Sequence, residues 1–236
     1  MSETAAPPSP SSSKWEDLID VFISPAELFR RRRDGKFGFG LLMLILFIAV
    51  IFFATRSAIQ PIMDAEFQRA MASRPNLTPE QVETGRKFAS SLAPIFVVVV
   101  LPITIFVLAG VIWLAGRVVG GRVSYAQGAT IATYAYFPRI LEYISNGVQA
   151  LVMDESKLTS HFSVSLGLAR LLDHEKLTPL LAFLGRVDLF TLWVTALVAV
   201  GLKQMTGTTT GRAVAAAALV WLIGALPTLL QAVRAG

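Results

Sequence analysis

Arg139 and Glu142 are the residues whose types and spacing could carry chemistry in this chain. They lie three positions apart in residues 124–153, a stretch long enough to cross a bilayer. Side chains three apart on a helix share a face and can form an ion pair. Burying such a pair in a membrane is costly, so it indicates either a proton or solute site or a neutralised contact that locks helices together. Pro138 removes one helical hydrogen bond and predicts a bend beside the pair.

The same stretch carries a stripe of polar side chains. At 100° per residue, positions 127, 130, 134, 138, 142, 145 and 149 fall on one arc of a helix. Polar groups in hydrocarbon cost several kcal/mol each without partners, so we expect this segment inside a bundle, wrapped by more apolar helices. Asp188 opens a later apolar segment, where an acid suits a helix N-terminus and can reach Arg186 or another span. The candidate intramembrane polar site is therefore Gln127, Thr130, Tyr134, Pro138, Arg139, Glu142 and Asp188.

Other catalytic chemistry has no visible support. The chain has no cysteine, which excludes disulfides and thiol chemistry. Its two histidines, His161 and His174, lack metal-ligand spacing. A glycine-rich nucleotide-binding loop follows a strand, but no strand is predicted before the glycine-rich residues 35–40. We expect no catalytic residues, no metal and no cofactor, and hence no enzyme.

Composition points to the bilayer as the principal partner. Of 236 residues, 54% are hydrophobic and 16% charged, against about 25% charged in soluble domains. The apolar residues occur in runs, which is typical of a polytopic membrane protein. The net charge is +5, but the basic residues flank apolar runs, which favours topology signals over nucleic acid binding. We expect no nucleic acid partner.

The chain divides into three parts. Residues 1–13 are rich in Ser and Pro and are predicted to be disordered. Residues 14–36 predict amphipathic interfacial helices, the first with Trp15, Leu18, Ile19 and Phe22 on one face, the second opened by a capping box at residues 24–27. Residues 37–236 predict an all-α membrane bundle with five transmembrane helices, at about 37–55, 92–115, 124–153, 182–202 and 213–233. The helix begun at residue 78 is expected to run into the second span.

A basic run ends the interfacial segment and has two compatible interpretations. Arg30, Arg31, Arg32 and Arg33, with Trp15, could contact anionic lipid headgroups, or the run could only fix orientation by the positive-inside rule. Two short turns, near residues 116–123 and 203–212, are also basic. Both fall on the inner side if the N-terminus is inside, and five spans then leave the C-terminus on the far side.

Three segments together resemble a known family. They are WEDLIDVFISPAELF before the first span, SYAQGATIATYAYFPRIL after the first basic turn, and DLFTLWVTALVAVGL. In this order they resemble the Yip (Ypt/Rab-interacting protein) family in its bacterial form, over residues 14–233. The resemblance implies an integral protein, here of a bacterial inner (cytoplasmic) membrane. Eukaryotic relatives are scaffolds that bind small GTPases and shape membranes, but the short leader lacks an obvious GTPase-binding module. The family supplies no catalytic residues to carry over.

Two functions stay open. The first is a non-catalytic scaffold or membrane-organising, trafficking-like protein with a protein partner or a second copy of itself. The alternative is a small transporter or channel subunit that uses the polar, kinked third span. A transporter would need a water-accessible cavity around Glu142 and loses its basis if the pair at residues 139 and 142 is sealed by neighbouring side chains. A scaffold predicts that crosslinking in native membranes captures specific proteins or a homo-oligomer.

Overall fold

The computed structural model describes residues 13–72, 78–173 and 177–235. Its regular elements are all helices, and in these ranges the only strand-like pairing is an isolated bridge between Gly167 and Asp188. The predicted all-α class is therefore confirmed. The leader predicted to be disordered, residues 1–13, lies outside the described residues except at its last position.

The N-terminal segment forms a helical hairpin, α1 (Glu16–Ile23) and α2 (Pro25–Arg31). The predicted pair of short helices is confirmed, but the capping box between them is wrong, because the Ser24 side chain caps nothing. The Ser24 backbone N–H instead closes α1 on the carbonyl of Asp20 at 2.8 Å, and the Glu27 carboxylate accepts from Arg30 at 3.3 Å. Pro25, at the first helical position, begins α2 without a side-chain cap.

Two long helices follow, α3 (Gly38–Ala72) and α4 (Pro79–Val118). At 1.5 Å per residue they are about 50 and 60 Å long, well beyond a hydrocarbon core of about 30 Å. Thr78 begins α4 with a reciprocal capping box to Gln81. The prediction that a helix begun there continues into the second span is confirmed.

The predicted third span is two helices rather than one: α5 (Tyr125–Ala135) and α6 (Pro138–Val152). Pro138 has no N–H to donate, and the chain tightens before it. Phe137 donates to the carbonyl of Tyr134 at 3.2 Å, three residues back, and Arg139 likewise bonds to Tyr136 at 3.0 Å. A bend was expected at this proline; the helix breaks instead.

The two halves differ in burial. Residues 128–135 of α5 are all buried, whereas α6 buries only Pro138, Gly147 and Ala150. The expectation of a shielded third span is therefore right for α5 and wrong for α6. Close approach explains the burial of α5, since a Cβ added at Gly128 would lie 2.7 Å from the backbone oxygen of Ala109 in α4.

The rest of the chain contains three short 3-10 helices, η1 (Glu155–Lys157), η2 (His161–Val164) and η3 (Leu168–Leu171), and then α7 (Pro179–Leu184), α8 (Leu189–Thr206) and α9 (Thr210–Ala235). The predicted fourth span, 182–202, is wrong at its start. Gly185 ends α7, and α8 begins only after Asp188, whose side chain caps it. The predicted fifth span lies within α9.

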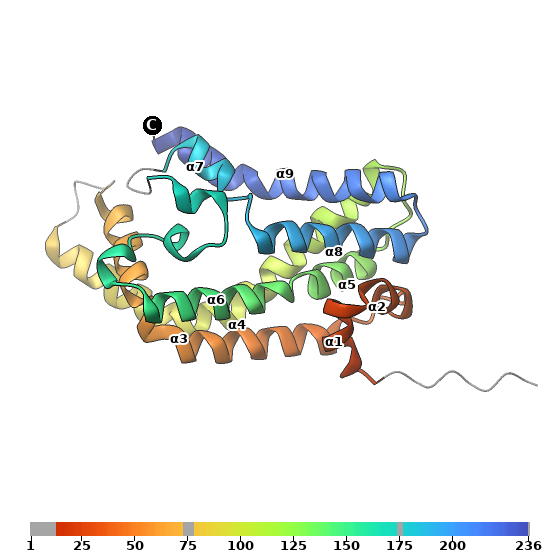
Figure 1. Cartoon of the computed structure of the whole chain (residues 1–236), viewed down its shortest axis with the longest axis horizontal. Coiled ribbons are helices and arrows are strands. Elements are labelled where there is room, and N and C mark those ends of the chain that lie inside the picture. Colours follow the sequence, from red (N-terminus) through yellow and green to blue (C-terminus); the bar gives the residue numbers. More distant parts are fainter. Residues whose placement is uncertain (1–12, 73–77, 174–176, 236) are drawn as a thin grey trace, which may run out of the picture.

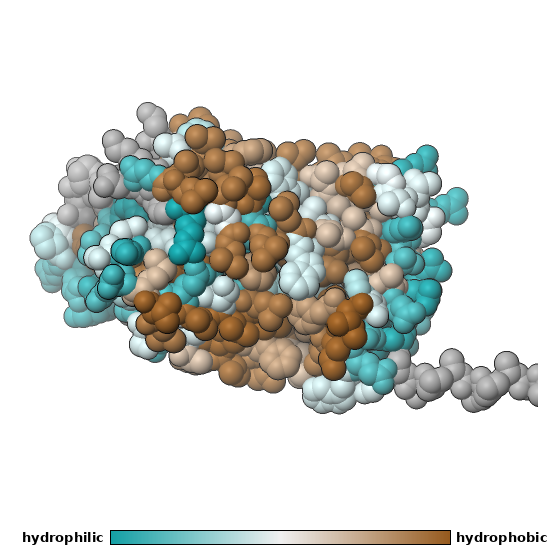
Figure 2. All heavy atoms as spheres, viewed as in Figure 1, coloured by the Kyte–Doolittle hydropathy of each residue, from teal (hydrophilic) through white to brown (hydrophobic). Residues whose placement is uncertain are grey.

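Within the part of the chain that the structure describes, four helices are long and apolar enough to cross a membrane: Gly38–Met71, Val98–Val118, Leu189–Thr206 and Thr210–Val233. The prediction of five such helices is one too many, because the break before Pro138 leaves α5 and α6 each too short. Figure 2 shows an apolar band around the middle of the molecule, with hydrophilic residues concentrated toward its two ends.

The connections between the helices lie at the two ends of the bundle (Figure 1). The α1–α2 hairpin, the α4–α5 turn and the α8–α9 turn lie at one end, and the end of α9 and residues 153–173 lie toward the other. The paired helices α5 and α6 run from the first end toward the second. Gly147 lets α6 contact α3, because a Cβ there would meet the Thr55 methyl at 2.3 Å.

Candidate functional site

A buried carboxylate in α1 holds the N-terminal hairpin to the bundle. Asp17 has no exposed side-chain surface, and its two oxygens accept from Arg31 at 2.6 Å and Arg32 at 2.5 Å. The Tyr134 hydroxyl, from α5, donates to the same carboxylate at 3.2 Å. We call Asp17, Asp20, Arg31, Arg32 and Tyr134 the N-terminal cluster. It connects the adjacent helices α1 and α2 to α5, in which Tyr134 lies 117 residues after Asp17.

The geometry of the hairpin produces this cluster. Asp17 and Asp20 lie three apart on α1 and share a face, and the short turn at Ser24 folds α2 back so that Arg31 reaches both carboxylates. Burial lowers the pKa of the Arg31 guanidinium, but the hydrogen bonds and charges of Asp17 and Asp20 outweigh that effect and raise it. Arg31 therefore stays charged, and the cluster holds two acids against two guanidinium groups.

A second set of charged groups lies where α6 meets α8. Arg139 pairs with Glu142 in its own helix and donates to the Thr191 hydroxyl at 2.9 Å. Thr191 in turn donates to Asp188, whose other oxygen accepts from the backbone N–H groups of Phe190 at 2.9 Å and Thr191 at 3.0 Å. We call Arg139, Glu142, Asp188 and Thr191 the mid-bundle cluster.

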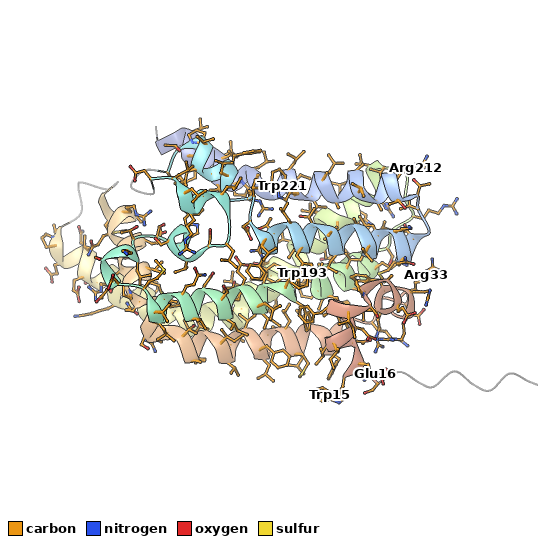
Figure 3. The ribbon with its side chains drawn as sticks, in the orientation of Figure 1. Trp15, Glu16, Arg33, Trp193, Arg212 and Trp221 are labelled. Carbon is orange, nitrogen blue, oxygen red and sulfur yellow. The ribbon has the colours of Figure 1, made fainter. Side chains whose placement is uncertain are left out.

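The mid-bundle cluster is enclosed to about the same degree as the N-terminal one, in which Arg31 and Asp20 keep 26% and 20% of their side-chain surface. The Arg139 and Glu142 side chains keep 18% and 19% of their surface, and the Nε atom of Arg139 is buried with no partner. Nearby, Arg186 and Trp221 exchange hydrogen bonds of 3.4 and 3.1 Å with each other's carbonyl oxygens, which ties the α7–α8 turn to α9. In Figure 3, Trp221 and Trp193 lie in the middle of the molecule.

The seven residues of the predicted intramembrane polar site thus lie in different environments. Tyr134 belongs to the N-terminal cluster, and Arg139, Glu142 and Asp188 belong to the mid-bundle cluster. Gln127 caps its own helix with Ser124 and donates to the carbonyl oxygen of Arg33 at 3.2 Å.

The other two residues of the predicted site, Thr130 and Pro138, act only within their own helices. The Thr130 hydroxyl bonds back to the carbonyl of Ala126 at 2.9 Å, and Pro138 makes the helix break. The seven predicted residues therefore do not form a single site.

Sequence reasoning missed Asp17 and Thr191. Asp17 sits among Glu16 and Asp20 on the polar side of an amphipathic helix, which usually faces water. The signal that could have found it is the arginine run fourteen to fifteen residues later, beyond a proline turn, which makes an acid–arginine hairpin possible. Thr191 carries no comparable signal, because it lies in an apolar segment.

The residues predicted to contact lipid headgroups also differ in their surroundings. Trp15 is exposed, and Arg30 is exposed and paired with Glu27. Arg31 and Arg32 point inward to Asp17, and Arg33 donates to the carbonyl of Gln204 at 2.7 Å. Lipid contact by the run stays a prediction, and Arg31 and Arg32 already use part of their donors on Asp17.

A cavity of about 700 Å³ lies between α3, α4, α6 and η2. Its lining is mainly apolar, with Thr55, Tyr143, Asn146 and His161 as the polar contributors. Neither Arg139 nor Glu142 lines it, so it is not the cavity that a transport role for that pair requires. Among the described residues there is no group of three side chains suited to hold a metal ion, and His161 pairs with Glu66 at 2.9 Å. His174 lies outside the described residues.

Comparisons with known proteins give the family. The family model for the Yip1 domain matches residues 19–230, which is most of the chain and includes both clusters except Asp17. Neither a curated protein nor a solved structure gave a significant match. The match begins inside α1 and ends inside α9, so it spans the whole helical bundle described above. The resemblance noted from the three segments is confirmed: the chain belongs to the Yip1 domain family, and it is an integral membrane protein.

Proposed function

We propose that this Yip1 domain protein is a non-catalytic scaffold that organises the membrane or holds a partner there. The observation that carries the proposal is the state of the N-terminal hairpin. Asp17 fixes the hairpin to the bundle, yet Trp15, Ile19 and Ile23 along α1 remain 62%, 61% and 71% exposed. A scaffold needs a surface that is fixed in place and still free to contact something, and this row of apolar side chains meets both requirements.

The buried charges support the same proposal. In the N-terminal cluster and the mid-bundle cluster, acids face arginines within hydrogen-bonding distance, which stabilises the arrangement of the helices. Removing one partner of such a pair is costly, so these groups suit a structural role.

Site-directed photo-crosslinking in native membranes tests the scaffold. A photo-reactive amino acid at Ile19 should give discrete protein adducts, and the same group at Val107, an exposed residue of α4, is the control. Two differently tagged copies of the chain identify a homo-oligomer as an adduct that carries both tags. Recovery of monomers alone from Ile19, or the same adducts from both positions, contradicts the proposal.

We also propose an arrangement in the membrane. The N-terminus lies in the cytoplasm of a bacterial cell, α5 and α6 together make a fifth crossing of the inner membrane, and the C-terminus lies on the far side. The gathering of the N-terminal hairpin and both short basic turns at one end supports it (Figure 1).

Cysteine labelling tests the arrangement, because the chain has no cysteine of its own. A cysteine at Thr208 should react only with reagent on the cytoplasmic side, and one at Lys157 only from the far side. If α5 and α6 return to the side they started from, Lys157 becomes cytoplasmic and Thr208 does not. That pattern would remove the fifth crossing.

A second function has one observation in its favour. The helix breaks directly before Arg139, and the Nε atoms of Arg139 and Arg186 are buried without partners, as in a site that could receive an anion or a proton carrier. Reconstituted in vesicles with an internal pH dye, a transporter would show proton or anion flux that Glu142→Gln abolishes. Flux equal to that of protein-free vesicles rejects it.

A further inference from the structure

A small pocket opens at the end of the bundle that carries the N-terminal hairpin. Its volume is about 230 Å³, and its lining residues are Lys14, Arg32, Lys36, Gly38, Phe39 and Tyr134. They come from the start of the hairpin, the end of α2, the α2–α3 connection, the first turn of α3 and the last turn of α5. Segments distant in the sequence therefore converge on one concave surface.

Among the described residues, those that line the pocket include three cations and no acid. Asp17, which contacts Arg32 and Tyr134 of this lining, is already bonded to two arginines and a tyrosine. Arg32 uses Nε and one terminal nitrogen on Asp17, and a guanidinium has a second terminal nitrogen with two more donors. Lys36 lies 3.9 Å from Asp34, but both side chains are more than 70% exposed, so that ion pair is weak. The field in the pocket therefore favours an anion.

The backbone adds to this preference. Gly38 and Phe39 belong to the first turn of α3, whose N–H groups have no carbonyl partner within the helix. The positive end of the dipole of this long helix points the same way. A Cβ added at Gly38 would meet no atom within 4 Å, so the space in front of the turn is open.

The location indicates where the anion comes from. Trp15 packs edge-on against Phe39 at 5.1 Å and is largely exposed, as is typical of a tryptophan at the membrane–water interface. Figure 3 places Trp15 at the outer edge of the same end as Arg33 and Arg212. The pocket lies beside this tryptophan, because Lys14 and Phe39 both line it.

We propose that Lys14, Arg32 and Lys36 form a binding site for the phosphate of an anionic lipid headgroup. The proposal rests on the membrane position of this end and goes beyond the scaffold function, which concerns the outer face of α1. It also changes which residues are assigned to lipid: two lysines beside the arginine run contact the headgroup, while Arg31 serves the fold.

Lipid retention by the full-length protein tests the proposal. The protein is reconstituted in discs of phosphatidylcholine and phosphatidylglycerol, extracted in mild detergent, and the bound lipids are counted by native mass spectrometry. Each lysine near the surface contributes about fivefold to anionic lipid binding, so Lys14→Gln with Lys36→Gln should lower the retained phosphatidylglycerol roughly 25-fold. Lys203→Gln with Arg212→Gln removes the same charge at the same end outside the pocket and should have little effect.

A second pair of variants avoids any loss of fold. Gly38→Asp places an acid in open space at a helix N-terminus, where acids are stabilising, and should abolish selective retention while leaving the melting temperature unchanged or higher. Gly211→Asp is the matched control, because that glycine lies in the first turn of α9 and also has open space around it.

The outcomes separate the alternatives. Equal losses in pocket and control variants overturn the proposal, because they show only a general attraction of the basic end. Displacement of the lipid by millimolar inorganic phosphate assigns the pocket to a free anion and overturns the lipid as its source. Since crosslinking from Ile19 does not depend on these side chains, failure of the lipid site leaves the scaffold test intact, and the reverse also holds.

Discussion

The N-terminal cluster and the mid-bundle cluster use the same residue types for different purposes. In the first, a fully buried acid on α1 contacts two arginines of α2 and a tyrosine of α5, so its hydrogen bonds join residues up to 117 positions apart. In the second, the ion pair joins residues three apart on one helix, and a single bond from Arg139 to Thr191 reaches α8. The first cluster attaches the α1–α2 hairpin to the bundle. The second reinforces the packing that α5 and α6 already make against α8.

The largest effect is expected at Asp17. Asp17→Asn removes the buried negative charge shared by Arg31 and Arg32 and leaves them only a neutral amide oxygen there, with Asp20 as the one remaining acid partner of Arg31. The loss should be about 3 kcal/mol of unfolding free energy. Thermal unfolding in detergent measures the loss, and limited proteolysis should show cleavage within the hairpin before the bundle unfolds. Asp20→Asn is the control: Asp20 contacts only Arg31 and is 20% exposed, so it should cost less than about 1 kcal/mol. Equal losses at the two positions would show that the burial of Asp17 is not what holds the hairpin.

An intermediate effect is expected at Glu142. Glu142→Gln leaves Arg139 with its bond to Thr191 and a neutral acceptor, so the loss should be about 1–2 kcal/mol. A double-mutant cycle with Arg139→Gln isolates the coupling between the two side chains. The cleavage of the α1–α2 hairpin should be unaffected in these variants. Hairpin release on loss of Glu142 would mean that the two clusters are coupled, contrary to the comparison.

The smallest effect is expected at Tyr134. Tyr134→Phe removes one hydrogen bond to Asp17 and keeps the ring, which is stacked on Phe137, so the loss should be about 1 kcal/mol. Thr130→Val is the control one turn earlier on α5, because its hydroxyl bonds only to its own helix and its loss should be smaller still. If the two substitutions cost the same, the tyrosine contributes packing alone to the attachment of the hairpin.

Much of the local structure could be read from the chain. The helix start at residue 78 and the acid at the start of the span, Asp188, depend on side chains within a few residues of each other, and the structure contains both effects. Pro138 was expected to bend a continuous helix, and the structure shows that it interrupts the helix. Two boundaries were wrong for a local reason as well. Ser24 already terminates α1, so its side chain does not cap α2, and Gly185 ends α7 before the fourth span begins.

Which residues come together in the candidate site could not be predicted from the sequence in the same way. A helical wheel places Tyr134, Pro138 and Glu142 on one arc only while the helix is continuous. The helix is interrupted at residues 136–137, and on its two sides Tyr134 bonds to Asp17 while Glu142 pairs with Arg139 of its own helix. Which partner an arginine of the basic run chooses depends on how the hairpin folds, and no spacing rule specifies that.

The sequence determined that this is an all-α membrane protein of the Yip1 domain family, because hydrophobic runs, caps and prolines act over one or a few turns. The tertiary structure decided which charges are buried and together. Asp17 looks like a solvated residue on a polar helix face until α2 and α5 close over it. Burial is a property of what packs against a residue, and in this chain the packing partners of Asp17 lie 14 to 117 residues away.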